Sequence, residues 1–211
     1  MMPLPLTCQK RKKTNTINYH FFRQFPMKKE SIFMLLLGCK PKGRYTEQHD
    51  VLFTIGSTLK ELIPDINSFW PESGSIHIDC WRTVTEVDGY NIEIMPASSK
   101  PTNQLRLFFI NLGGYKPDEF EEYHYKTIIV AENKTLAIKK AKESAFFKHT
   151  GFKGAETHID DKYGIDVDDF YAIEDILPSS IKSKYSIHIS ESNTSRKDDW
   201  NIGYTNLSKI K

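Results

Sequence analysis

The sequence lacks the short motifs that mark the most common catalytic and nucleotide-binding sites. It has no GxSxG nucleophile elbow and no GxxxxGK[ST] phosphate-binding loop. The acidic run HIDDKYGIDVDD does not follow the DxDxDG order of a calcium-binding loop. Any functional site must therefore be sought among side chains that the fold brings together.

Cysteine is scarce, and long apolar runs are absent. Cys8, Cys39 and Cys80 form an odd set without CxxC spacing, which argues against a disulfide framework or a thiolate zinc site and favours a reducing cytoplasm. No apolar run approaches the roughly 20 residues needed to span a bilayer, so we expect no membrane partner. The net charge is only +2, much of it from the N-terminal CQKRKK, so we do not expect nucleic acid as a partner.

An internal repeat organises what is present. A shift of 75 aligns IFMLLLGCKPKGRYTEQHD with LFFINLGGYKPDEFEEYHY without a gap, so that Gly38 meets Gly113. A shift of 81 then aligns HIDCWRTVTEVDGYNIE with HIDDKYGIDVDDFYAIE, and the difference of six implies an insertion in the second copy. We therefore expect two tandem copies of one unit, related by a pseudo-two-fold axis.

Each copy has the pattern of a small, mostly antiparallel sheet with a helix. In the first copy strands are predicted over 32–37, 49–55, 76–81 and 90–95, with a helical pattern from Leu59 to Phe69 that Pro64 interrupts. In the second copy the first two strands are predicted over 107–112 and 124–130. The second helix is predicted from Thr135 to about His149. The predicted fold class is α+β, with two tandem copies and a C-terminal β-hairpin.

The expected boundaries follow from the repeat. Residues 1–30 match neither copy and are expected to be a disordered extension or a misassigned start. A lipoprotein leader beginning at Met27 is disfavoured, because its apolar stretch has six residues and its counterpart in the second copy is an internal strand. The remaining expected segments are repeat unit 1 at 31–96, a linker at 97–104, repeat unit 2 at 105–178 and a hairpin at 179–211.

The repeated His-Ile-Asp tripeptide supplies the first candidate site. Residues two apart on a strand share a face, so His77 and Asp79 point the same way. If the strands pair around the Asp88-Gly89 turn, Glu93 joins them. The matching set in the second copy is His158, Asp160 and Glu174. One imidazole and two carboxylates could hold a divalent metal or share acid–base chemistry, and the alternative is a hydrogen-bonded structural set.

A second pair of candidates comes from the other strand. Glu47 and His49, like Glu122 and His124, share a face, and that face continues through Val51 into a predicted core. We expect these residues to point inward and to be candidates for binding. On this reading Glu47 and His49 cannot join His77 in one site.

The motifs also resemble a known family. The segments LLLGCKPKGRYTEQHDVLFTIG, HIDCWRTVTEVDGYNIEI, LFFINLGGYKP and HTGFKGAETHIDDKYGIDVDDFYAIEDIL look like the bacterial domain of unknown function 1543, over about residues 31–178. The resemblance implies a cytoplasmic bacterial protein with one or two copies of the domain. It implies no activity, cofactor or catalytic residue.

The sequence leaves two classes of function open. The first is a non-catalytic module that binds a small molecule or a protein in the groove between the copies. The second is a metal-dependent or acid–base enzyme that uses the His-Ile-Asp face. The sequence identifies neither a ligand nor a cofactor.

Overall fold

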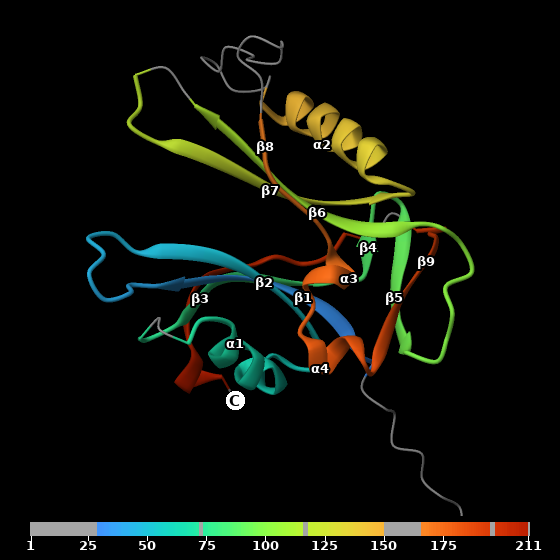
Figure 1. Cartoon of the computed structure of the whole chain (residues 1–211), viewed down its shortest axis with the longest axis horizontal. Helices are drawn as coiled ribbons and strands as arrows, with labels where there is room; N and C mark the ends of the chain where they lie inside the picture. Colours follow the sequence, from blue (N-terminus) through green and yellow to red (C-terminus); the bar gives the residue numbers. More distant parts are fainter. Residues whose placement is uncertain (1–28, 72–73, 116–117, 150–165, 195–196, 211) are drawn as a thin grey trace, which may run out of the picture.

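The computed structural model describes residues 29–71, 74–115, 118–149, 166–194 and 197–210. These residues form antiparallel sheets with short helices, an α+β arrangement as predicted (Figure 1). The strands are β1 (Ser31–Cys39), β2 (Gln48–Gly56), β3 (His77–Val84), β4 (Glu86–Val87), β5 (Tyr90–Pro96), β6 (Arg106–Tyr115), β7 (Glu122–Ala131), β8 (Asp166–Ala172), β9 (Tyr185–Glu191) and β10 (Asn201–Asn206). The helices are η1 (Leu59–Leu62), α1 (Ile63–Phe69), α2 (Lys134–His149), α3 (Ile173–Ile176), α4 (Ser179–Lys182) and η2 (Leu207–Lys209).

Two sheets pack face to face, and each has a helix on its outer side. The first has the strand order β10-β3-β1-β2 and is covered by α1, while the second has the order β7-β6-β8 and is covered by α2 (Figure 1). Between the sheets, the rings of Phe53 and Phe109 lie 5.2 Å apart in one buried apolar cluster. Both faces of each sheet are therefore buried along much of their length, which explains the continuous apolar runs of the central strands.

The helices agree with the sequence patterns. The first helical segment divides before Pro64 into η1 and α1, and Pro64 lies in the first turn of α1, where a missing N–H is tolerated. The second forms α2, whose Ala137 and Ala141 are buried against β6 and β7. In the part of the chain that the structure describes, none of the helices has the length and apolar character needed to cross a bilayer.

The two facing sheets share one pairing pattern. In each, a central strand pairs antiparallel with two neighbours, and the register to the third strand shifts at matching places, between Leu36 and Leu37 in β1 and between Asn111 and Leu112 in β6. Gly38 pairs with His77, whereas Gly113 pairs with Asp166. In the second sheet β8 therefore takes the place that β3 has in the first sheet. The equivalent residues, His77 and Asp166, are 89 positions apart in the sequence.

This offset corrects the alignment of the third strands. The prediction that His77 and Asp79 correspond to His158 and Asp160 is wrong for the strand pairing, because β8 begins after both. His158 and Asp160 lie outside the described residues. A tripeptide match is too short to fix register, whereas the hydrogen-bonded ladder against β6 fixes it residue by residue.

The last strands of each predicted unit also differ from expectation. The Asp88-Gly89 turn forms, with φ of 53° and 80°, but it joins β4 to β5 in a separate three-stranded sheet of order β4-β5-β9. The predicted C-terminal hairpin is wrong, because β9 pairs with β5 and β10 pairs with β3. The edges of β3 and β5 both gain a backbone partner in this way, β10 for β3 and β9 for β5.

Candidate functional site

The first cluster of polar side chains forms over Gly38, near the end of β1. Gly38 is paired with His49 of β2 on one side and with His77 of β3 on the other. Directly opposed residues on neighbouring strands point to the same face, so both histidines stand over the glycine. A Cβ atom on Gly38 would lie 2.4 Å from His77 Nε2 and 2.6 Å from Asp79 Oδ2. The shared space depends on residue 38 having no side chain.

Four side chains meet in this space, and we call them the first cluster: Glu47, His49, His77 and Asp79. His77 Nε2 lies 3.1 Å from Glu47 Oε1 and 3.3 Å from Asp79 Oδ1. His49 Nε2 lies 3.1 Å from Asp79 Oδ2 and 3.8 Å from Glu47 Oε2. The expectation that the two pairs cannot form one site is wrong.

The two pairs can form one cluster because the first sheet has two buried faces, whereas the sequence interpretation assumed one. Ile78 packs beneath α1, whereas Phe53 packs between the sheets. The inward face of β2 and the face of β3 that bears His77 are therefore the same inter-sheet face. The apolar core occupies one end of this face, and the polar cluster occupies the other.

A second cluster lies at the matching place on the opposite sheet: Glu122, His124 and Asp168. His124 Nε2 lies 3.4 Å from Asp168 Oδ2 and 3.9 Å from Glu122 Oε2, and one ligand atom from each residue lies within 4.8 Å of the others. A Cβ atom on Gly113 would lie 2.4 Å from Asp168 Oδ2, much as a Cβ atom on Gly38 would lie 2.6 Å from Asp79 Oδ2. Glycine thus makes room for a carboxylate in both sheets.

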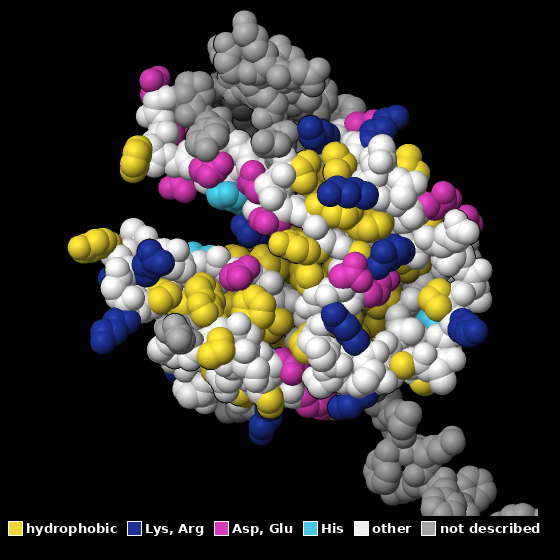
Figure 2. Space-filling view, viewed as in Figure 1, with side chains coloured by type: hydrophobic (Ala, Val, Ile, Leu, Met, Phe, Trp, Pro, Cys, Tyr) yellow, Lys and Arg dark blue, Asp and Glu magenta, His cyan; other side chains and the backbone are white. Residues whose placement is uncertain are grey.

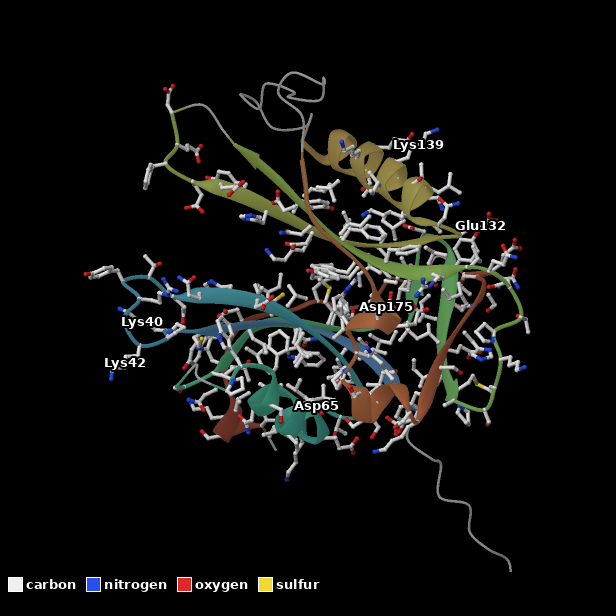
Figure 3. All side chains as sticks on the ribbon, viewed as in Figure 1. Lys40, Lys42, Asp65, Glu132, Lys139 and Asp175 are labelled. Carbon is white, nitrogen blue, oxygen red and sulfur yellow. The ribbon has the colours of Figure 1, made fainter. Side chains whose placement is uncertain are left out.

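The two clusters face each other across a cleft. Glu122 and His124 share a strand face with Ile128 and Val130, which pack in the inter-sheet core. The space-filling view shows this hollow between the sheets, with histidine and acidic side chains at its walls (Figure 2). Lys40 and Lys42 mark the tip of the loop from β1 to β2 beside the opening (Figure 3).

The other predicted members lie elsewhere. Glu93 is on β5, outside the first sheet, and forms an ion pair of 2.8 Å with Lys29. Glu174 lies in α3, not in a strand, and its Oε2 is 3.3 Å from Arg106 Nη2. The prediction that Glu93 joins the face of His77 and Asp79 is therefore wrong, because β5 pairs with β9 and not with β3. The predicted partners of Glu174, His158 and Asp160, lie outside the described residues.

Four histidine–carboxylate contacts of 3.1–3.8 Å join the first cluster, whereas the three residues whose ligand atoms all lie within 4.8 Å of one another, among the described residues, are those of the second cluster. Ligand atoms about 2.0–2.2 Å from a zinc-like ion lie about 3.0–3.6 Å from one another when they are adjacent in the coordination shell. Asp79 Oδ2 is buried and has no hydrogen-bond partner, although His49 Nε2 is only 3.1 Å away.

The residues of the first cluster differ in solvent exposure: His77 is buried at the floor of the cleft, and His49 and Glu47 are accessible at its mouth. His77 is 7% exposed and its ring lies against that of Tyr204, with centroids 4.5 Å apart. The side chains of His49 and Glu47 are 43% and 44% exposed. The cluster therefore has a rigid, buried side on β3 and an accessible side on β2.

Cys80 follows the cluster on β3 and is half-buried. Burial, and next the neighbouring Asp79 carboxylate, raise the pKa of the Cys80 thiol. Near neutral pH this group is a thiol and not a thiolate, which makes it a poor nucleophile. Cys39 is buried, and burial raises its pKa also.

The sequence patterns identified Glu47, His49, His77 and Asp79 as candidates, but they did not predict that the four side chains lie together. They did not identify Asp168. A usable signal was present in the gapless shift of 75, which pairs Gly38 with Gly113 as well as the histidines. A glycine on a central strand, between neighbouring strands that carry histidine and carboxylate residues, indicates that these side chains need the space above the glycine. The glycines explain why the polar groups can meet.

The fold and the two clusters define a protein of two facing antiparallel sheets with a histidine- and carboxylate-lined cleft. Residues 44–94 match the model of a family described as Domain of Unknown Function (DUF1543), and this segment contains the whole first cluster. The match supports the resemblance found in the sequence.

One solved structure with a similar fold is described as the crystal structure of a protein Il1583 from Idiomarina loihiensis. It aligns with a TM-score of 0.59 at 20% sequence identity, covering 84% of this chain and 98% of that chain. The likeness at this identity shows the fold alone. The comparison with curated proteins gave no match.

Proposed function

We propose that this is a metal-dependent ligand-binding protein, whose first cluster binds one divalent transition metal, such as Zn²⁺, at the mouth of the inter-sheet cleft. The observation that carries the proposal is the geometry of Asp79 Oδ2, which is buried, 3.1 Å from His49 Nε2 and without a hydrogen-bond partner. A bound cation would satisfy this oxygen and both imidazoles at once.

His49, His77 and Asp79 are the proposed metal ligands, because all three lie on the rigid strands β2 and β3. Glu47 precedes β2 and belongs to a loop, so it faces the remaining coordination position with more freedom. Three protein ligands with an open position are typical of metal sites that act on a ligand or a water molecule.

Hydrolysis is the second candidate function, and the position of Glu47 favours it. The Glu47 carboxylate lies 3.1 Å from His77 Nε2 at the accessible side of the cluster. A metal-bound water in the open position could give its proton to this carboxylate as general base. The enzyme would then be a metal-dependent hydrolase.

The proposal includes the tandem duplication. The common strand pairing, the matching register shifts and the glycines Gly38 and Gly113 support an origin from two copies of one unit. The second cluster would be the weaker metal site, because it has only one histidine among its three residues and all three are exposed. The groove between the copies would hold the ligand. The free thiols of Cys39 and Cys80 support a reducing, cytoplasmic setting.

The test is native mass spectrometry of the full chain purified without chelators and then titrated with Zn²⁺. We expect one tightly bound ion, lost in His49→Ala and in His77→Ala. The matched controls are Glu93→Gln and Glu174→Gln, which change carboxylates outside the cluster and should keep the ion. Equal metal content in His77→Ala and the unaltered protein would overturn the proposal.

The variants also separate binding from hydrolysis. Glu47→Gln should retain the ion, because strand residues hold it, and should abolish turnover of any hydrolysable ligand. If Glu47→Gln loses the ion as His77→Ala does, Glu47 is a ligand, and the general-base role is excluded.

A further inference from the structure

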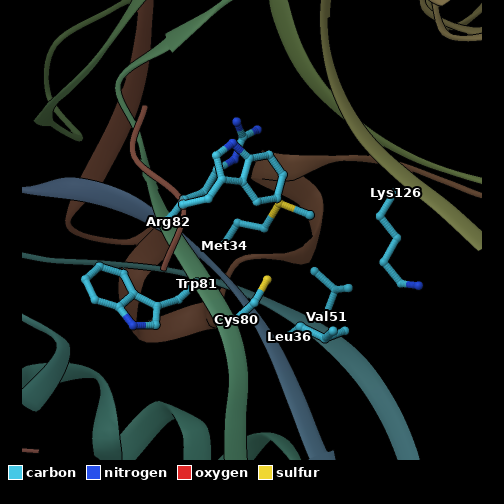
Figure 4. A pocket seen from close by; sticks show the side chains of 8 residues that line it. Met34, Leu36, Val51, Cys80, Trp81, Arg82 and Lys126 are labelled. Carbon is cyan, nitrogen blue, oxygen red and sulfur yellow. The ribbon is translucent and has the colours of Figure 1, made fainter. Parts of the chain in front are cut away.

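A small apolar cavity lies beside the first cluster, between the two sheets. Its volume is about 70 Å³, and it is partly open to solvent. Leu36, Val51 and Cys80 of the first sheet line it, and so does the half-exposed ring of Trp200. Figure 4 shows the side chains of the first sheet around this space, together with Lys126 of the second sheet.

The lining of this cavity is almost wholly apolar. Arg82 and Lys126 are its two charged residues, and because the lining is apolar they contribute mainly the methylene groups of their side chains. The guanidinium of Arg82 lies 4.7 Å from the ring centroid of Trp200. A polar group placed in the cavity would lose its hydrogen bonds to water, whereas an apolar group would gain by leaving water.

The two sheets differ in chemistry at this position. In the first sheet Leu36 is paired with Val51 and with Cys80, and all three side chains are only half-buried. At the matching register of the second sheet the paired residues are polar: Asn111, Lys126 and Asp169. Facing sheets normally bury apolar side chains from both sides, so this wall keeps apolar surface that a ligand can cover.

The cavity is the next position along the cleft face from the first cluster. Val51 follows His49 by two residues on β2, and Leu36 precedes Gly38 by two residues on β1. Residues two apart on a strand share a face and lie about 6.6–6.8 Å apart. One small molecule can therefore place a polar end at the cluster and an apolar end in the cavity.

We propose that this cavity is the subsite for the short aliphatic end of a ligand whose polar end binds the metal of the first cluster. The inference rests on the proposed function, because the metal holds the polar end. An apolar cavity of about 150 Å³ accommodates benzene, so one of about 70 Å³ fits a group of about three carbon atoms. The ligand class is therefore a short-chain aliphatic compound with a metal-binding head group.

The test compares two zinc-binding probes, acetohydroxamate and hexanohydroxamate, by titration calorimetry on the zinc-loaded full chain. Both have the same polar end, and only the second has an alkyl chain long enough to reach the cavity. We expect hexanohydroxamate to bind about tenfold more tightly or better, because several methylene groups leave water. Val51→Phe should remove this preference, because the larger side chain fills the cavity. Leu136→Phe, at an exposed position of α2, is the matched control and should keep it.

Two further measurements keep the inference testable. Cys80→Met also fills the cavity and serves as a second variant if Val51→Phe does not fold, as judged by circular dichroism. Xenon NMR on the metal-free full chain tests the cavity without zinc, since apolar cavities bind xenon. We expect a xenon signal that the folded cavity-filling variant loses.

The outcomes separate the subsite from the metal. Equal affinities for the two hydroxamates, or no binding of either to the zinc-loaded chain, would overturn this inference. A xenon signal unchanged in the folded cavity-filling variant would also overturn it. Zinc bound without any chain preference refutes the subsite alone, whereas xenon bound in the cavity of a chain that takes up no zinc refutes only the metal.

Discussion

His49 and Asp79 reach each other across the central strand β1, with His49 Nε2 3.1 Å from Asp79 Oδ2. The residue between them is Gly38, and any Cβ there would enter the space that their side chains occupy. One glycine therefore determines whether the four polar side chains of the first cluster can meet. The equivalent Gly113 has the same relationship to Asp168.

Replacing Gly38 by alanine should disable the first cluster while leaving the fold in place. The added methyl group would lie 2.4 Å from His77 Nε2, so the imidazole must move. We expect zinc affinity to fall by about 10–100-fold, the range seen when groups that orient ligands are altered. Zinc titration with a competing chelator measures it. Gly114→Ala is the control, because a Cβ at Gly114 meets nothing within 4 Å; equal losses in both variants would contradict the prediction.

Zinc should stabilise the folded chain, because the cluster exists only when β1, β2 and β3 are paired. At a free zinc concentration of 100 times Kd, the gain is about 2.7 kcal/mol. For a chain of this size that corresponds to a rise in Tm of about 5–10 °C. Differential scanning calorimetry with zinc or with EDTA measures the shift. The His77→Ala variant should show no comparable rise, and a full rise there would place the metal elsewhere.

Phe53→Ala should destabilise both sheets together. Phe53 is 1% exposed, and its ring contacts that of Phe109 across the inter-sheet core. Removing such a side chain costs about 3–5 kcal/mol of unfolding free energy. Urea denaturation followed by circular dichroism measures it. Phe120→Ala, at a fully exposed position, should change stability by less than about 0.5 kcal/mol. A similar small effect in Phe53→Ala would show that the sheets do not depend on each other.

Glu174→Gln tests a pH dependence with a defined sign. Burial raises the pKa of Glu174, and the partly exposed Arg106 beside it opposes the shift. A carboxyl with a raised folded-state pKa favours folding below the ordinary value of about 4.3, and this contribution is lost as pH rises through the folded-state value. The variant should therefore be at least as stable as the unaltered chain at pH 7, and the difference should shrink as pH falls to about 4.

Chemical denaturation at several pH values checks this prediction. The control is Glu143→Gln on the exposed side of α2. If Glu174→Gln is less stable than the unaltered chain at pH 7, the ion pair with Arg106 outweighs the burial of the carboxyl.

Local sequence patterns predicted the elements that depend on neighbours in the chain. Alternating and continuous apolar runs gave β1, β2, β6 and β7, and helical spacing gave α2, because these periodicities follow from backbone geometry alone. The Asp88-Gly89 turn is also local, since both residues take positive φ.

The site was only partly predictable for the same reason. The histidines and carboxylates stood out as residue types at two-residue spacing, but their meeting depends on which face of the sheet is covered. A single-core model placed Glu47 and His77 on opposite faces. The packing of Phe53 against Phe109 creates a second core, and with it a shared polar face.

The sequence by itself determined the strand and helix periodicities, the glycine positions and the inventory of metal-binding residue types. Only the tertiary structure decided that β8, and not the second His-Ile-Asp segment, occupies the place of β3, and that β9 and β10 join different sheets. Strand pairing between distant segments is chosen by hydrogen-bonded register and by packing on both sheet faces. Neither is encoded in any short window of residues.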